Sequence, residues 1–405
     1  MLAFNLRAAI TSLPPVFPEL SATLHLSSAS LAALAAVPVL CFGLFSGVAA
    51  PLSRRFGEER VLGWSAVLLA AGLLLRGVAP LVLLFPGTII ASASIAMMNV
   101  LLPSLVKRRR PDQAGLLIGL YLMSLSAGAI VGSLIAVPVF TAAGGGNGAV
   151  RLTLGLWALP ALVAAVAWLP QMRFRVLPDA RARSRTGPAP AAGPPPAAGH
   201  HGVLAMRRHA LAWQVTAFMG LQSLLYYAAL SWFPTMFRDR GASAVHAGDL
   251  LALMNFGNAV TAMLLPVLAH RARDQRVLVA VSTAATCAGM AGSAFAPLGT
   301  AAAWVLLLGL GQGATLGLGI FLTMARAPDP ATAASLSGFA QGGGYLLAAT
   351  GPLLIGFLHS ATGGWAVPIG ALLGVAAVQV VIGWLAGRDL TVPQPVSLPG
   401  QVRAG

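Results

Sequence analysis

The sequence predicts an all-α membrane protein with twelve transmembrane helices in two pseudo-symmetric halves of six. Three observations lead to this prediction: apolar residues occur in long blocks, charged residues are scarce, and basic residues cluster between alternate blocks. Apolar residues make up 57% of the 405 residues and charged residues 9%, whereas a soluble domain carries about 25% charged residues. Each block approaches the roughly 20 residues that a helix needs to cross hydrocarbon. The chain has too little charge to cover a soluble surface of this size.

The apolar blocks define twelve predicted spans. Glycine and proline are frequent within them, and both are tolerated in membrane helices where neighbouring helices compensate. No cleavable signal peptide precedes the first block, which we expect to be the first membrane helix. The predicted spans cover residues 1–20, 31–50, 61–79, 81–105, 115–140, 150–170, 211–237, 247–269, 277–297, 300–324, 331–360 and 365–386.

The distribution of lysine and arginine predicts the orientation of these spans. If the N-terminus lies in the cytoplasm, 20 of the 25 basic residues fall in cytoplasmic connections, and only Arg151, Arg238 and Arg240 fall in outer ones. Cytoplasmic loops are enriched in basic residues in this way. The net charge of +15 is therefore a signal of topology, and we expect no nucleic-acid partner. We predict a multi-pass protein of the inner membrane, with both termini cytoplasmic, surrounded by lipid and monomeric.

The chain divides into two similar halves. Residues 173–208 form a cytoplasmic linker whose centre, 187–199, is rich in proline, alanine and glycine and cannot form a packed core. The predicted domains are a first half at 1–172, this linker, a second half at 209–387 and a cytoplasmic tail at 388–405. Similar positions in the two halves are separated by offsets of 215 to 219 residues. They include Phe17 with Phe233, Gly132 with Gly351, and Trp168 with Trp384.

Arg7 is the main candidate for a functional charge within a span. A charge inside the membrane is costly and needs a reason. One interpretation is a cation that faces a central cavity and holds an anionic or strongly dipolar substrate. The other is an anchor at the cytoplasmic end that extends toward the interface. Met1 begins almost directly in apolar sequence, and a start farther upstream would place Arg7 deeper.

The remaining charges in or near the spans give no coupling group. We expect Arg76, near the outer end of span three, to be an interface anchor. Glu19 and Asp249 lie near the outer ends of spans one and eight. A proton-driven transporter usually needs a buried titratable group, and no carboxylate is well placed here. The coupling ion therefore stays open, with a proton as one candidate.

Uncharged polar residues recur in the spans and predict a polar cavity between the halves. A carboxamide that faces lipid would leave its donors and acceptors unsatisfied, so these side chains face protein or water. For any single residue, a hydrogen bond between helices is the simpler interpretation. For the set, we favour substrate binding. The predicted substrate-binding residues are Asn5, Arg7, Thr11, Asn99, Tyr121, Gln222, Tyr226, Asn255, Gln312, Gln341 and Tyr345.

The sequence offers no sign of catalysis, a metal or a cofactor. It contains no metal-spaced cysteine and histidine set, zinc-protease motif or nucleophile elbow. The pair His200 and His201 lies in the linker, where a metal site is not expected. The glycines between 309 and 319 follow no strand and precede no lysine, so we expect close helix packing there rather than a phosphate loop. We predict a protein that is not an enzyme.

Short motifs in order along the chain resemble the cyanate/nitroimidazole transporter family of the major facilitator superfamily. They cover nearly the whole chain except the linker and the tail. The motifs are Asn5-Leu6-Arg7 with Thr11-Ser12; residues 99–103 (NVLLP) with Val106-Lys107-Arg108; Gly119-Leu120-Tyr121; 220–223 (GLQS) with Tyr226 and 232–234 (WFP); 250–254; 274–276 (DQR); 309–313 (GLGQG); and Gln341 with Gly344-Tyr345.

The resemblance implies a single-chain permease of the major facilitator fold that works by alternating access on cyanate or nitroimidazole-type compounds. It also implies roles for Asn5, Arg7, Asn99, Tyr121, Gln222, Tyr226, Gln312 and Gln341, which match family positions. The superfamily's loop motif between spans two and three is only partly present: Ala50 and Arg54 stand where a glycine and an aspartate are usual, while Gly57 and Arg60 remain.

The sequence thus favours a secondary active transporter that moves a small anionic or polar solute across the inner membrane. The alternative is a proton-coupled drug or multidrug exporter.

Overall fold

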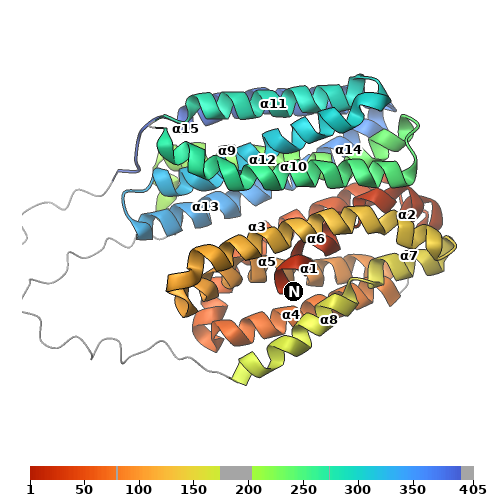
Figure 1. Ribbon diagram of the computed structural model, residues 1–405, viewed down its shortest axis with the longest axis horizontal. Helices are drawn as coiled ribbons and strands as arrows, with labels where there is room; N and C mark the ends of the chain where they lie inside the picture. Colours follow the sequence, from red (N-terminus) through yellow and green to blue (C-terminus); the bar gives the residue numbers. More distant parts are fainter. Residues whose placement is uncertain (79–80, 174–202, 273, 394–405) are drawn as a thin grey trace, which may run out of the picture.

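Helices form every regular element in the part of the chain that the computed structural model describes, which is residues 1–78, 81–173, 203–272 and 274–393. They run side by side along the longest axis of the molecule (Figure 1). Within this described part, ten segments are long and apolar enough to cross a membrane. They correspond to predicted spans two to six and eight to twelve, so the all-α membrane class is confirmed.

The helices group into two sets that follow one another along the chain. The first set comprises α1 (Leu2–Thr11), η1 (Pro14–Val16), α2 (Phe17–Leu24), α3 (Ser28–Phe56), α4 (Glu58–Val78), η2 (Leu81–Leu83), α5 (Leu84–Arg109), η3 (Pro111–Gln113), α6 (Ala114–Ala142), α7 (Gly146–Gly155), α8 (Ala158–Trp168) and η4 (Leu169–Arg173). The second set comprises η6 (Val203–Arg208), α9 (Ala210–Asp239), α10 (Ala244–Arg271), α11 (Arg276–Phe295), η7 (Leu298–Thr300), α12 (Ala301–Ala325), α13 (Pro330–Ala348), α14 (Thr350–Thr362) and α15 (Ala366–Ala386).

Predicted spans one and seven are the two that do not meet the length and hydropathy criteria for a span. Helix α1 has ten residues, which extend about 15 Å at 1.5 Å per residue, and it begins between the two ends of the bundle (Figure 1), where Met1 is exposed. Pro14 and Pro15 end it, because proline removes a backbone donor from the helix. Helix α9 is 30 residues long, but it carries polar side chains and is buried along most of its length. The count of twelve spans stays a prediction at these two places.

Proline also explains why predicted spans six and eleven are each built from two helices. Span six is α7 followed by α8, and span eleven is α13 followed by α14. Pro160 and Pro352 each lie in the first turn of the second helix. Proline is tolerated there because the first turn has no internal partner for its missing N–H group.

The two sets of helices pack along a shared interface. In Figure 1, α1–α8 occupy the lower part of the view and α9–α15 the upper part. Helix α3 packs against α13 and α14, and α6 packs against α10. Within each set the same pattern of neighbours recurs: α4 contacts α5 and α8, as α11 contacts α12 and α15, while α1 contacts α6 as α9 contacts α13. The central cavity lies at this interface.

Glycines allow the first helix of each set to approach its partner closely. A Cβ on Gly128 of α6 would lie 2.1 Å from the carbonyl oxygen of Phe4, and one on Gly132 would lie 2.7 Å from that of Ala8. In the second set, a Cβ on Gly220 of α9 would lie 3.1 Å from the Cα of Gly344 on α13. The glycines of α12 behave similarly, since Cβ atoms on Gly309 and Gly313 would meet backbone atoms of α10. The predicted role of glycine in helix packing is confirmed for α12.

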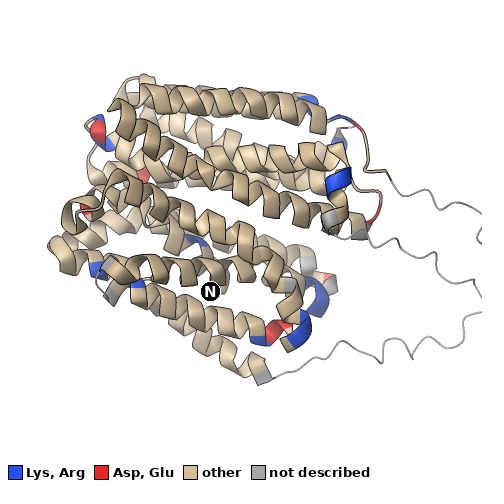
Figure 2. Cartoon of the chain, turned by 180° about the vertical axis from the view of Figure 1, so that it is seen from behind, with Lys and Arg blue, Asp and Glu red and all other residues tan. Residues whose placement is uncertain are grey.

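Charged residues gather at one end of the bundle, which we call the linker end because Arg173 and Val203 lie there; we call the opposite end the far end (Figure 2). In the first set, Glu59 is 2% exposed and accepts hydrogen bonds from Arg108 and Arg109 at 2.9 and 3.0 Å. Its backbone carbonyl accepts a hydrogen bond from the indole of Trp168. Glu59 thus provides a carboxylate five residues after Arg54, the position at which the resemblance leads one to expect an aspartate.

The second set builds its linker-end contact differently. Arg326 is 2% exposed and donates to the side-chain oxygen of Gln275 and to the carbonyls of Ala386 and Gly387. Burial lowers the pKa of the Arg326 guanidinium, and the charge of Asp389 partly offsets this effect. Arg326 in the second set thus corresponds to Arg108 and Arg109 in the first, and the amide of Gln275 corresponds to the carboxylate of Glu59.

The close approach of α1 and α6 gives a test of the fold. Replacing Gly128 by alanine should lower the free energy of unfolding by about 1–3 kcal/mol, because the new methyl group meets backbone that cannot move aside easily. Gly119→Ala on the same helix is the matched control, since no atom lies within 4 Å of its Cβ position. Thermal unfolding of the purified protein in detergent measures both variants. Equal unfolding temperatures for the two would contradict this packing.

Candidate functional site

A cavity of about 110 Å³ lies at the interface between the two sets of helices. Helices α1 and α6 line it from the first set, and α9, α10 and α12 from the second. Its exposed wall residues Leu122, Met263 and Ile320 lie on the linker side of their helices, so the cavity extends toward the linker end. Its lining consists of Arg7, Leu122, Leu125, Ser126, Ala129, Tyr226, Asn255, Asn258, Ala259, Ala262, Met263, Leu316 and Ile320.

Arg7 carries the only charge in this lining, within the described residues. Its Nη1 atom donates a hydrogen bond to the hydroxyl of Tyr227 at 3.4 Å, and its guanidinium carbon lies 5.9 Å from the ring centre of Tyr226. Both tyrosines belong to the opposite set of helices. This geometry fits a cation that faces the cavity and not an anchor that extends to an interface.

All four tyrosines of the chain lie near enough to Arg7 to interact with its charge. Tyr121, Tyr226, Tyr227 and Tyr345 each interact with it electrostatically. None of the ion pairs found among the described residues includes Arg7. Hydroxyl groups and aromatic faces stabilise a cation without neutralising it. The cavity therefore has a net positive charge.

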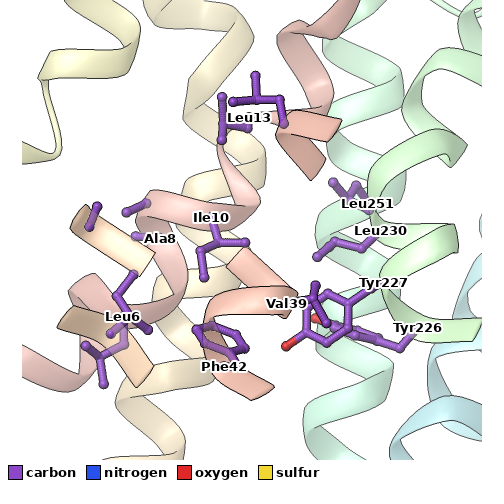
Figure 3. Close-up of a cluster of buried hydrophobic side chains, with 14 of the residues drawn as sticks. Leu6, Ala8, Ile10, Leu13, Val39, Phe42, Tyr226, Tyr227, Leu230 and Leu251 are labelled. Carbon is purple, nitrogen blue, oxygen red and sulfur yellow. The ribbon is translucent and has the colours of Figure 1, made fainter. Parts of the chain in front are cut away.

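Aromatic side chains form the wall beside Arg7. Figure 3 shows Tyr226 and Tyr227 together on α9, near Phe42 of α3. The rings of Tyr226 and Tyr227 are 5.1 Å apart, and Phe42 lies 6.4 Å from Tyr227 and 5.6 Å from Tyr345. Tilted and edge-on aromatic contacts of this kind are favourable. They hold the tyrosine hydroxyls in place around Arg7.

Asn255 connects the cavity wall to the interface between the sets. Its side-chain oxygen accepts a hydrogen bond from the hydroxyl of Tyr226 at 2.9 Å. Its Nδ2 atom donates to the Leu251 carbonyl at 3.0 Å and to Ser133 of α6 at 3.4 Å. Because Ser133 is in the first set, this network positions Tyr226 relative to both halves.

The structure brings Arg7, Tyr226 and Asn255 together in the cavity, while other predicted residues make contacts outside its lining. Tyr121 and Asn99 bond to each other at 3.0 Å. Gln341 donates to Ser337 of its own helix at 2.9 Å. The ring of Tyr345 lies 5.6 Å from that of Phe42, and Tyr345 interacts electrostatically with Arg7.

Four further predicted residues are buried between helices and do not line the cavity. Thr11 donates to the carbonyls of Arg7 and Ala129 at 3.1 and 3.0 Å, which joins α1 to α6. Gln312 donates to the carbonyl of Leu225 at 3.3 Å, and Asn5 donates to that of Met1 at 3.2 Å. Gln222 donates to Ser223 beside it at 2.6 Å. For Thr11 and Gln312 the contact is a hydrogen bond between helices, which is the simpler interpretation given above for any single polar residue. For Asn5 and Gln222 the contact lies within one helix.

Three residues outside the predicted set also belong to the site. Ser126 and Asn258 line the cavity, and Tyr227 accepts the hydrogen bond of Arg7. Asn258 and Tyr227 are polar residues in predicted spans, which is a signal that the sequence provides. Ser126 has no such signal, because a single serine in a membrane helix usually bonds to its own backbone.

The prediction that Arg76 is an interface anchor is wrong. Arg76 is 4% exposed, and its guanidinium donates to the carbonyls of Ala9 at 3.1 Å and Leu154 at 3.5 Å. It therefore joins α4 to α1 and α7. Pro15 follows α1 within a few residues, so the last carbonyls of that helix are available to an outside donor.

The cavity is closed at the far end. Glu19 of α2 accepts a hydrogen bond from Arg238 of α9 at 2.5 Å, which joins the two sets. The rings of Phe17 and Trp232 lie 6.2 Å apart. A Cβ on Gly248 of α10 would lie 2.9 Å from the carbonyl oxygen of Ser133, so the backbones nearly touch there. The site is thus accessible from the linker end and closed toward the far end.

Comparison with known proteins gives a consistent result. The family model of the Major Facilitator Superfamily matches residues 1–352. The 2-nitroimidazole transporter of Escherichia coli is 37% identical over 96% of this chain and 94% of its own length. The cyanate transport protein CynX of the same organism is 29% identical over 90% of each chain.

A solved structure shows the same fold. The crystal structure of a bacterial homologue of the human lysosomal transporter Spinster, in an inward-facing and occupied conformation, superimposes with a TM-score of 0.74. It covers 97% of each chain at 14% sequence identity. At this identity the likeness supports the arrangement of the helices and no more.

Closure of the far end gives a test through the pair Glu19 and Arg238. Replacing Glu19 by glutamine should raise access to the cavity from the far-end side by about two- to fivefold, since such pairs contribute roughly 0.2–1 kcal/mol. A cysteine at Ser126, with Cys41 and Cys287 replaced by serine, reports access through its labelling rate with a membrane-impermeant maleimide added to either side.

The charge-reversed double variant, Glu19→Arg with Arg238→Glu, is the control and should restore slow labelling from the far-end side. If Glu19→Gln and the double variant label at the same rate, the ion pair does not hold this end closed.

Proposed function

Because the chain belongs to the Major Facilitator Superfamily, we propose that its cavity at Arg7 binds a small anionic or strongly dipolar solute for transport across the inner membrane. Members of this superfamily are secondary transporters rather than enzymes, and alternating access carries the solute from one side to the other. The cavity between the two sets of helices lies where such folds bind their substrates.

The observation that carries the proposal is the cation at Arg7 without a carboxylate partner among the described residues. A guanidinium offers a planar fork of donors that matches a planar anion or a nitro group. The hydroxyl of Tyr227 and the amides of Asn255 and Asn258 would supply further hydrogen bonds. The cavity volume of about 110 Å³ suits a small solute.

The names of the two relatives agree with this chemistry. Cyanate is a small linear anion, and 2-nitroimidazole is a planar ring with a strongly dipolar nitro group. Both would place oxygen or nitrogen lone pairs against Arg7 and a π-system against the ring of Tyr226. We propose solutes of this class for the present chain.

A drug exporter fits the site less well. Apolar drugs require a large cavity, and cationic ones would be repelled by Arg7. The cavity is small, and its charge is positive within the described lining. The site therefore favours the permease for small anions over the multidrug exporter.

We also propose the orientation of the chain in the membrane. The basic residues at the linker end (Figure 2) would face the cytoplasm, which would place both termini and the linker there. The protein would act as a monomer, because one chain holds both halves of the cavity. The predicted domain limits at 172, 208 and 387 are kept in this proposal; most of the linker and the end of the tail lie outside the described residues.

Arg7 provides the test of the binding site. Uptake of cyanate and of 2-nitroimidazole should fall by at least about tenfold in Arg7→Ala, and Arg7→Lys should retain only part of it, because an ammonium lacks the planar fork of donors. The increase in unfolding temperature on adding either compound should disappear in Arg7→Ala, since a ligand that binds the native state stabilises it.

Arg76→Ala is the matched control, because Arg76 is a buried arginine outside the cavity. It should lower the unfolding temperature but keep the shift on adding ligand. Full transport of both compounds by both Arg7 variants would show that Arg7 is not the anchor.

A further inference from the structure

We propose that this transporter is an anion exchanger, in which the cavity crosses the membrane with a second small anion bound instead of returning empty. The proposal rests on the proposed function, since it concerns the same Arg7 site. The counter-substrate is a small anion from the other side of the membrane. The proposal is based on one observation: no acidic residue in the described lining pairs with the positive charge of Arg7.

None of the acidic residues that the structure describes lines the cavity. The chain has ten acidic residues, and Asp179 lies outside the described residues. The other nine lie near helix ends or in connections, and several have partners there: Glu19 pairs with Arg238 at the far end, and Glu59 pairs with Arg108 at the linker end. The remaining described acidic residues are Glu58, Asp112, Asp239, Asp249, Asp274, Asp329 and Asp389.

No other titratable group in the described lining can adjust the charge of the site. The lining contains no histidine, and its polar groups other than Arg7 are a tyrosine, a serine and two asparagines. A phenol or an amide donates or accepts a hydrogen bond but does not carry a negative charge near neutral pH. The charge of the empty site is therefore positive within the described lining.

This charge matters most when the cavity closes at both ends. In the open state, water from the linker end solvates Arg7. In the occluded state that water is excluded, and an unpaired buried charge is strongly destabilising. A bound anion neutralises the guanidinium and provides the acceptors that water had provided. The loaded cavity therefore closes more easily than the empty one.

The region beyond Tyr227 has little room for water to replace it. A second, small cavity lies there, on the far-end side, with a volume of about 10 Å³. Its wall is mostly apolar and includes Ile10, Leu13 and Phe17, while Tyr227 and Ser231 are its polar residues. A space of this size holds at most about one water molecule. An empty carrier would have to close around a poorly solvated cation, which favours return with an anion bound.

The test uses the purified full chain in proteoliposomes, with radiolabelled cyanate as the probe. One set of vesicles contains unlabelled cyanate and the other contains buffer only. Initial uptake into the cyanate-loaded vesicles should be on the order of ten- to a hundredfold faster, because only these vesicles provide an anion for the return step. A potassium diffusion potential should leave the one-for-one exchange unchanged, since no net charge moves.

The outcomes separate the two proposals. Equal uptake into both sets, at rates that depend on Arg7, would overturn exchange and leave the proposed transport function standing. Accumulation in buffer-loaded vesicles driven by an inward proton gradient would also overturn exchange, in favour of proton coupling. Absence of any Arg7-dependent uptake in either set would overturn the proposed function for this substrate, and the exchange proposal with it.

A variant with a negative charge in the cavity wall tests whether the unpaired charge of Arg7 is the reason that the empty carrier returns slowly. Asn258→Asp adds a carboxylate of the same shape to the cavity wall and should bring the ratio of loaded to empty uptake close to one, because the empty site becomes neutral. Asn258→Leu has a similar size without a charge, and it should keep the high ratio. Because the readout is a ratio within one preparation, partial loss of folded protein does not affect it. A high ratio in both variants would contradict the role of the unpaired charge.

Discussion

The cation at Arg7 is the constraint on which the rest of the site depends. It lies between two sets of apolar helices, in a medium where a charge without solvent or a partner is unfavourable. The described lining gives it phenol rings, hydroxyls and amides in place of a carboxylate. These groups make the cation tolerable while the cavity is open to water. They leave its charge for a ligand to neutralise, which links substrate binding to closure of the cavity.

The repeated architecture explains how so polar a site can exist within an apolar bundle. Arg7 lies on the first helix of the first set, and Tyr226 and Tyr227 lie on the first helix of the second. These are the two predicted spans that are not apolar enough, or not long enough, to qualify as spans by composition. Their polarity is compatible with a membrane because other helices surround them. Glycines such as Gly128 and Gly220 let those helices approach to backbone contact, so packing replaces contact with lipid.

The two ends of the bundle are held by different interactions. At the far end, contacts between the sets close the cavity: the pair of Glu19 and Arg238, and the aromatic contact of Phe17 with Trp232. At the linker end, the strong polar contacts lie within each set, around Glu59 in the first and Arg326 in the second. Because those contacts do not cross between the sets, the linker end can stay open while each half keeps its own shape. The structure therefore has the asymmetry that an alternating-access carrier needs in one of its two states.

The sequence by itself determined the class of the protein and its long spans, and it indicated Arg7 as the main candidate for a functional charge. Long apolar blocks, sparse charge and ordered motifs are one-dimensional signals, because each helix in a membrane must satisfy its own backbone. The same signals indicated Arg7, since a charge in an apolar block is conspicuous. Only the tertiary structure decided which polar residues face the cavity. Asn255 and Gln312 look alike in sequence, yet one lines the cavity and the other bonds to a backbone carbonyl. The burial of Arg76 against the end of α1 was also decided by packing, because the partners of a side chain depend on how helices rotate against one another.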